Sequence, residues 1–217
     1  KRTLRYLAEN VKLPAVEFRT CMRNTSRRAT EPDCLYHWKD FDEKFKTVNL
    51  NDDVTIHEEP TFDRQTTFRI EEELDLNSFL RHNILNKIFN EILFKNINDN
   101  VEFKTYLTRS KKDKKPDYSL YKNGKLVFPI EIKMPFEEDQ EVRRIDLSAD
   151  TNQLSCIYQV YEYMNENDVF YGMLTTYRQT WFLHLDEQVK GKKIVYISRA
   201  YKENELIKSI NLKKNLA

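Results

Sequence analysis

Glycine is scarce in this chain, with 3 residues among 217. Neither GxxxxGK nor GxGxxG occurs, which excludes the two common glycine-rich loops that hold nucleotide phosphates. Cysteine is also rare, and Cys21, Cys34 and Cys156 have no CxxC spacing. That pattern argues against a zinc site or a disulfide framework, and it favours a reducing compartment.

The chain also lacks an excess of charge and any long apolar run. The formal net charge is +1, so binding to nucleic acid would need a local basic patch rather than bulk charge. No segment reaches transmembrane length and no signal peptide is visible. We therefore expect no membrane contact and an intracellular site of action, in the cytoplasm or nucleus. Because the chain begins at Lys1 rather than Met, we expect a fragment without its targeting signal.

Aromatic residues, by contrast, are plentiful, with 13 Phe and 12 Tyr. They argue against disorder, and the length suffices for one sizeable core with extensions. Residues 1–66 are weakly patterned, so we interpret them as an N-terminal extension or small cap. Residues 67–217 then form the main domain.

Apolar spacing predicts alternating helices and strands in the main domain. Asn77 and Ser78 are suitable N-caps for its first helix. The order favours an α/β fold with a central mixed β-sheet flanked by helices. The expected helices cover 77–94, 150–164 and 202–210, and the strands cover 101–108, 116–122, 125–134, 169–176, 180–186 and 193–198.

The most informative stretch covers residues 116–133. Asn123-Gly124 separates two runs rich in Tyr, Val, Ile and Phe, which predicts a β-hairpin. Side chains alternate across a strand, so Glu131 and Lys133 should share one face. The intervening isoleucines, Ile130 and Ile132, should then enter a core on the other face.

Asp117, on the neighbouring strand, can approach the same polar face. Two carboxylates and a lysine at the end of a hairpin can hold a divalent metal and a water against a phosphodiester. The alternative is an exposed edge hairpin that carries a surface pair between Glu131 and Lys133.

Pro116-Asp117 and Glu131-x-Lys133 on successive strands resemble the motifs of the PD-(D/E)xK, or restriction-endonuclease-like, nuclease superfamily. Gln159 and Tyr163, on the helix that follows, match the Gln-x-x-x-Tyr motif of several members. The resemblance covers roughly residues 75–200. The stretch 171–183 also looks like nuclease-like modules of fungal and oomycete crinkler-type effectors and kinase-linked proteins.

The resemblance implies a restriction-endonuclease-like core and a role for each motif residue. Asp117 and Glu131 would bind Mg²⁺ or Mn²⁺, with the carbonyl of Ile132 as a further ligand. Lys133 would orient the attacking water and stabilise negative charge. Gln159 would hold the substrate or a metal-bound water, or, alternatively, would be a capped polar residue on a surface helix.

Family members often carry a further metal-binding glutamate in the first helix. Glu91 is the candidate here, with a plain surface residue as the alternative, and His82 is a second option. The glutamates at 71–73 precede the predicted helix. Without this ligand the site would hold one metal.

A basic run directly precedes the hairpin, and two arginines follow it. These residues suit contacts with the nucleic-acid backbone, although a solvated loop is an equal alternative for the run. Nothing in the sequence reads base edges, so we expect little sequence specificity. The candidate nucleic-acid-binding residues are Lys111, Lys112, Lys114, Lys115, Arg143 and Arg144.

The leading hypothesis is a Mg²⁺-dependent endonuclease that acts on DNA rather than RNA, as a module of a secreted or host-targeted effector. The alternative is a nuclease-derived module that binds nucleic acid or a partner protein with weak or no cleavage. A third hypothesis is self-association as a homodimer through the aromatic rings of the second hairpin, namely Tyr171, Tyr177, Trp181 and Phe182.

Overall fold

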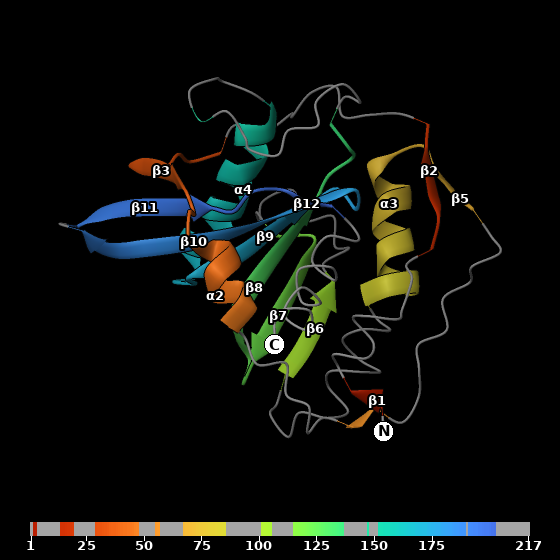
Figure 1. The fold of residues 1–217 in the computed structure, drawn as a ribbon, viewed down its shortest axis with the longest axis horizontal. Helices are drawn as coiled ribbons and strands as arrows, with labels where there is room; N and C mark the ends of the chain where they lie inside the picture. The colour runs from red at the N-terminus through yellow and green to blue at the C-terminus, as the bar shows by residue number, and fades with distance from the viewer. Residues whose placement is uncertain are drawn as a thin grey trace, which may run out of the picture.

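A mixed β-sheet of eight strands forms the centre of the fold in the computed structural model (Figure 1). It confirms the predicted α/β class with a mixed central sheet. The structure describes residues 2–3, 14–19, 29–47, 55–56, 67–85, 101–105, 115–136, 147, 152–189 and 191–202.

The sheet combines an antiparallel meander with parallel junctions. β6 to β8 pair antiparallel, β8 and β9 pair parallel, and β9 to β11 pair antiparallel. β3 joins β11 in parallel at one edge, and β12 pairs with β10. The spatial order is β3 (Cys34–His37), β11 (Lys192–Ile197), β10 (Gln179–Val189), β9 (Tyr171–Thr175), β8 (Lys125–Ile132), β7 (Tyr118–Lys122) and β6 (Val101–Thr105), with β12 at Tyr201–Lys202.

The hairpin between β7 and β8 forms as predicted. Asn123 and Gly124 have φ angles of 52° and 74°, the left-handed conformation that a two-residue hairpin turn requires. Ile130 and Ile132 are 1% and 0% exposed and lie in a core together with Tyr118. The predicted alternation along β8 is therefore confirmed.

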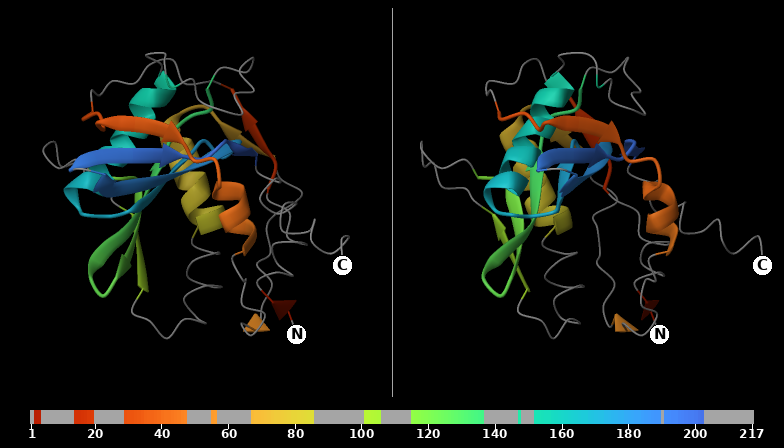
Figure 2. Two further views of the ribbon diagram at one scale, coloured as in Figure 1. Left: turned by 60° about the vertical axis from the view of Figure 1, so that its left-hand side comes forward. Right: turned by 90° about the vertical axis from the view of Figure 1, so that its left-hand side faces the viewer.

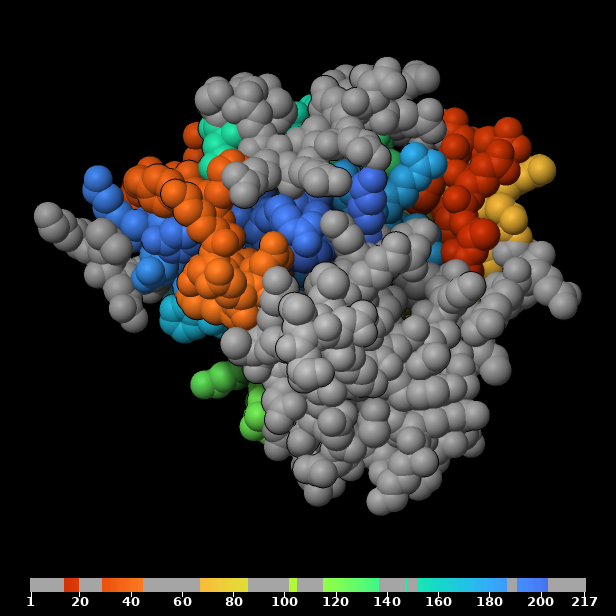
Figure 3. All heavy atoms as spheres, in the orientation of Figure 1, coloured from red at the N-terminus to blue at the C-terminus, as the bar shows by residue number. Residues whose placement is uncertain are grey.

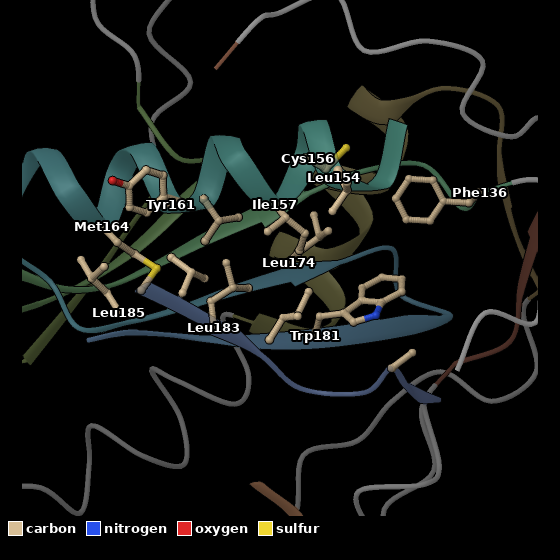
Figure 4. Close-up of a cluster of buried hydrophobic side chains, with 14 residues drawn as sticks. Phe136, Leu154, Cys156, Ile157, Tyr161, Met164, Leu174, Trp181, Leu183 and Leu185 are labelled. Carbon is tan, nitrogen blue, oxygen red and sulfur yellow. The ribbon is translucent and has the colours of Figure 1, made fainter. Parts of the chain in front are cut away.

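Helix α4 (Asn152–Glu166) covers one face of the sheet, close to its predicted span. Figure 4 shows Ile157 and Met164 of α4 above Leu174 of β9 and Leu183 of β10. Trp181 fills the end of this core and is 0% exposed. Among the helices that the structure describes, none is long and apolar enough to cross a membrane.

Helix α3 (Glu73–Leu80) packs against the other face and continues into a π-helical turn, η1 (Arg81–Leu85). It begins four residues before Asn77, so the predicted N-caps are wrong. The physical reason is a capping box, in which the Asp75 carboxylate accepts from the backbone amide of Glu72 over 3.2 Å and the Glu72 carboxylate accepts from the backbone amide of Asp75. The predicted part of this helix beyond residue 85 lies outside the described residues.

The sheet is strongly twisted. Figure 2 shows the green strands β6 to β8 turned steeply against the blue β10 and β11, the usual right-handed twist accumulated across a wide sheet. α3 and α4 pack on opposite faces of the sheet and belong to two separate cores. The start of α3 lies near the carboxyl end of β8, where Glu73 Oε1 is 3.2 Å from Lys133 Nζ.

The N-terminal third contributes to the same sheet. β3 forms its edge strand, and helix α2 (Phe41–Thr47) follows it, with the Phe41 ring stacked at 5.2 Å on Phe182. Figure 3 shows this orange region directly beside blue β11. The domain boundary that we expect between residues 66 and 67 stays a prediction.

Two short two-stranded sheets join β1 (Arg2–Thr3) to β4 (Thr55–Ile56) and β2 (Val16–Phe18) to β5 (Phe68–Ile70).

The end of the chain differs from expectation where it is described. Tyr201–Lys202 form β12 rather than the start of a helix, because they pair with β10. The rest of the predicted helix at 202–210 lies outside the described residues.

Gly172 of β9 lies directly against α4. A Cβ atom at this position would lie 2.7 Å from Val160 Cγ1 and 2.8 Å from Met164 Sδ. We expect Gly172→Ala to lower the free energy of unfolding by about 1–3 kcal/mol, because it overpacks a filled core. Urea unfolding measures this. Combining it with Val160→Ala should give a loss smaller than the sum of the two single losses, and an unchanged midpoint for Gly172→Ala would contradict the packing.

Candidate active site

Asp117 is tied to the carboxyl end of β8 by a backbone hydrogen bond. The amide of Ile132 donates to Asp117 Oδ2 over 2.8 Å. Tyr118 pairs with Ile130, so the next position outward places Asp117 opposite Glu131 on the polar face. The two predicted carboxylates are therefore brought to one place.

Lys133 connects this pair to a third carboxylate. Its Nζ lies 2.8 Å from Glu131 Oε1 and 3.2 Å from Glu73 Oε1 at the start of α3. The backbone of Lys133 is fixed as well, because its amide donates to the carbonyl of Thr175 over 3.0 Å. Asp117, Glu131 and Lys133 thus gather as the motif predicts.

The cluster is shielded from water. The side chains of Lys133 and Glu131 are 11% and 6% exposed, whereas that of Glu73 is 43% exposed. β8 also lies between β7 and β9, inside the sheet. The alternative of an exposed edge hairpin with a surface Glu–Lys pair is therefore wrong.

Burial and like charge act together on Asp117. Removal from water, followed by the charge of Glu131, raises the pKa of Asp117 to about 8, although Lys133 and the Ile132 amide oppose the shift. Burial alone would lower the pKa of Lys133, but the charges of Glu131, Asp117 and Glu73 together raise it above its usual range. Lys133 therefore stays an ammonium at neutral pH.

Helix α4 packs against β8, the strand that carries Glu131. Its Cys156 is fully buried, and this burial raises the pKa of the thiol to about 12. Gln159, three residues along α4, is its neighbour on the helix surface and is 4% exposed. The alternative of a surface residue is wrong for Gln159.

The chemistry of the cluster suits a hard cation. Carboxylate oxygens are the donors that Mg²⁺ and Mn²⁺ prefer, and Asp117, Glu131 and Glu73 supply them around one ammonium. In the described part of the chain, however, no three His, Cys, Asp or Glu residues stand in a metal-holding arrangement. Lys133 instead bridges Glu131 and Glu73, so a cation would have to draw these carboxylates away from it.

Several predicted site residues cannot be placed. Glu91 and most of the basic candidates, namely Lys111, Lys112, Lys114, Arg143 and Arg144, lie outside the described residues. Lys115 is described and is exposed just before Pro116, which suits contact with a phosphate. His82 is exposed in η1.

Glu73 is the site residue that sequence reasoning missed. It is the last of three consecutive glutamates, which precede the helix predicted from the sequence at residue 77. The signal that could have found it is the capping box between Glu72 and Asp75, because this places the helix start at Glu73.

The aromatic hairpin is divided between the core and the surface. Trp181 and Tyr177 are 0% and 6% exposed, so they are not available as an interface. Tyr171 is 49% exposed and stacks on His184 at 4.9 Å. Phe182 packs against Phe41. Two of the four rings in the self-association hypothesis, those of Tyr177 and Trp181, are therefore buried in the core.

Comparisons of the chain with protein-family models, with curated proteins and with solved structures find no match. The functional assignment therefore depends on the geometry of the cluster and on the motif resemblance.

The raised pKa of Asp117 predicts a pH dependence of stability. A carboxyl that ionises near pH 8 in the folded state, against about 3.9 in the unfolded state, destabilises the fold as pH rises between these values. We expect Asp117→Asn, which keeps an oxygen acceptor for the Ile132 amide, to remove this loss. Its stability relative to the wild type should increase by about 1 kcal/mol per pH unit between pH 5 and 8. Urea unfolding across that range would refute this if the difference stays flat or reverses.

Proposed function

We propose that this protein is a metal-dependent nuclease that hydrolyses phosphodiester bonds in nucleic acid. The observation that carries the proposal is the shielded cluster in which Lys133 contacts Glu131 beside Asp117. An ion cluster of this kind costs desolvation free energy, and apolar residues of similar volume are often as stable there. Its position at the end of a hairpin, next to a half-exposed Glu73, suits a site that meets substrate.

We also propose that the sheet is a restriction-endonuclease-like core. In support, α3 precedes the antiparallel strands β6 to β8, and α4 connects β8 to the parallel strand β9. The motif residues fall at the corresponding places, with Asp117 before β7, Glu131 in β8 and Gln159 in α4. This is the order of elements on which the resemblance depends.

Asp117 and Glu131 would hold Mg²⁺ or Mn²⁺, with Glu73 in the place proposed earlier for Glu91. The carbonyl of Ile132 completes the candidate ligand set. Such an ion, when bound, acidifies a water and neutralises charge on the phosphate. The types of donor suit it, because Asp117, Glu131 and Glu73 supply carboxylate oxygens.

Lys133 would act on the substrate directly. Its raised pKa keeps three N–H donors available at neutral pH, and release from Glu131 would let it donate to the attacking water or to a phosphate oxygen. α4 excludes bulk water from this side, which strengthens each charge interaction. Gln159 would orient the bound water or the substrate from α4.

The substrate class rests on the resemblance and on the exposed Lys115. We propose double-stranded or single-stranded DNA in preference to RNA, cut internally with little sequence specificity. Residues 171–183 resemble the nuclease-like modules of crinkler-type effectors. We therefore propose that the chain is a module of a secreted or host-targeted effector.

A second candidate function is a nuclease-derived module that binds nucleic acid or a partner protein without cutting. The observation in its favour is that Lys133 is paired with both Glu131 and Glu73 and bridges two of the carboxylates that a cation would need. If these pairs persist in the presence of Mg²⁺, the cluster is a structural ion network.

Cleavage of plasmid DNA and of RNA with Mg²⁺ or Mn²⁺, against an EDTA control, tests the proposal. We expect Asp117→Ala, Glu131→Ala and Lys133→Ala each to lower the cleavage rate by about 100-fold or more, as the loss of one charge-stabilising group does in other active sites. Lys125→Ala is the matched control, because Lys125 is an exposed lysine at the far end of the same strand.

Circular dichroism and urea unfolding would show which variants remain folded. Equal cleavage by the wild type and by folded Asp117→Ala and Lys133→Ala would overturn the nuclease proposal. Binding of DNA without cleavage in any divalent ion would favour the binding module.

Metal binding should release protons. At pH 7 the Asp117 carboxyl, with its pKa raised to about 8, is largely protonated, and it must ionise to bind a cation. Titration calorimetry with Mn²⁺ in buffers of different ionisation enthalpy should show release approaching one proton per ion at pH 7 and little at pH 9. Asp117→Asn should abolish the release. Tight binding without release at pH 7 would exclude Asp117 as a ligand that ionises.

A further inference from the structure

Ser119 is a buried hydroxyl without a bonding partner. It lies in β7, directly opposite Pro129 of β8 and Lys104 of β6, and it is 0% exposed. Its Oγ has no hydrogen-bond partner among the residues that the structure describes. Pro129 cannot supply an N–H donor or a side-chain acceptor, so this neighbour leaves the hydroxyl unpaired.

An unpaired buried hydroxyl lowers stability, because it gives up its bonds to water and gains none. Ser198 shows how the same chain treats a structural serine. It is 1% exposed, accepts from the amide of Phe182 over 2.9 Å and donates to the carbonyl of Arg199 over 2.8 Å. Ser119 has the burial of Ser198 but not its bonds, so its hydroxyl needs another explanation.

Strand geometry places Ser119 on the face that carries the candidate active site. Tyr118 belongs to the core on the opposite face, and alternation therefore puts Ser119 on the same side as Asp117. Across the hairpin, Ser119 pairs with Pro129, which lies two residues before Glu131 in β8. Lys133 lies two residues after Glu131. Glu131 thus lies between a hydroxyl on one side and an ammonium on the other.

We propose that Ser119 is a positioning residue for Glu131. The inference rests on the proposed function, in which Lys133 leaves Glu131 to act on the substrate. When it does, the Glu131 side chain is released from the salt bridge that now holds it 2.8 Å from Lys133 Nζ, and it turns so that Ser119 Oγ donates a hydrogen bond to its carboxylate. Ser119 then orients the carboxylate towards the cation and gains the partner that it lacks in the structure described here.

The test compares Mn²⁺ affinity and stability in four proteins, namely the wild type, Ser119→Ala, Ser119→Cys and Ser198→Ala. Alanine and cysteine both remove the strong donor, one with less volume and one with slightly more. We expect each to weaken Mn²⁺ binding by about 10-fold, as the loss of a group that orients a metal ligand does. The cation-free midpoint of urea unfolding should stay the same or rise for Ser119→Ala, because an unpaired buried hydroxyl is removed.

Ser198→Ala is the matched control and should behave in the opposite way. Its unfolding midpoint should fall, while its Mn²⁺ affinity, measured under folding conditions, stays that of the wild type. Wild-type affinity in both Ser119 variants would overturn the role of Ser119 and leave the nuclease proposal intact. A fall in the cation-free midpoint of Ser119→Ala as large as that of Ser198→Ala would also overturn it. If the wild type itself binds no Mn²⁺, the proposed function fails, and this inference fails with it.

Discussion

The hydrogen bond from the Ile132 amide to Asp117 is the contact on which the candidate site depends. It joins the start of β7 to the end of β8 and holds the register in which Tyr118 faces Ile130. A slip by one residue would exchange the two faces of β8. Glu131 would then enter the core that Ile130 and Ile132 now fill, and the cluster would not form.

The cluster of Asp117, Glu131, Lys133 and Glu73 has a cost in stability. Two carboxyl groups and a lysine are withdrawn from water beside a third carboxylate, and an apolar set of similar volume could be at least as stable. Lys133 offsets part of the cost by bridging Glu131 and Glu73. Burial, followed by the charge of Glu131, raises the pKa of Asp117.

Local patterns predicted the parts of the fold that local physics controls. Asn123-Gly124 specified the turn through its φ preference, and alternation placed Ile130 and Glu131 on opposite faces. The start of α3 was missed, because Asn77 and Ser78 looked like caps while the capping box lay upstream at Glu72. Capping side chains compete with one another, and here the capping box of Glu72 and Asp75 sets the helix start.

The sequence by itself determined the hairpin, the α/β class and the convergence of Asp117, Glu131 and Lys133, because turn chemistry and strand alternation act within a few residues. Only the tertiary structure decided that Glu73 reaches Lys133 from 60 positions away, that β3 closes the sheet edge, and that Gln159 is buried. These features depend on how a twisted sheet and two helices pack together. No periodicity in the chain encodes which distant side chains then become neighbours.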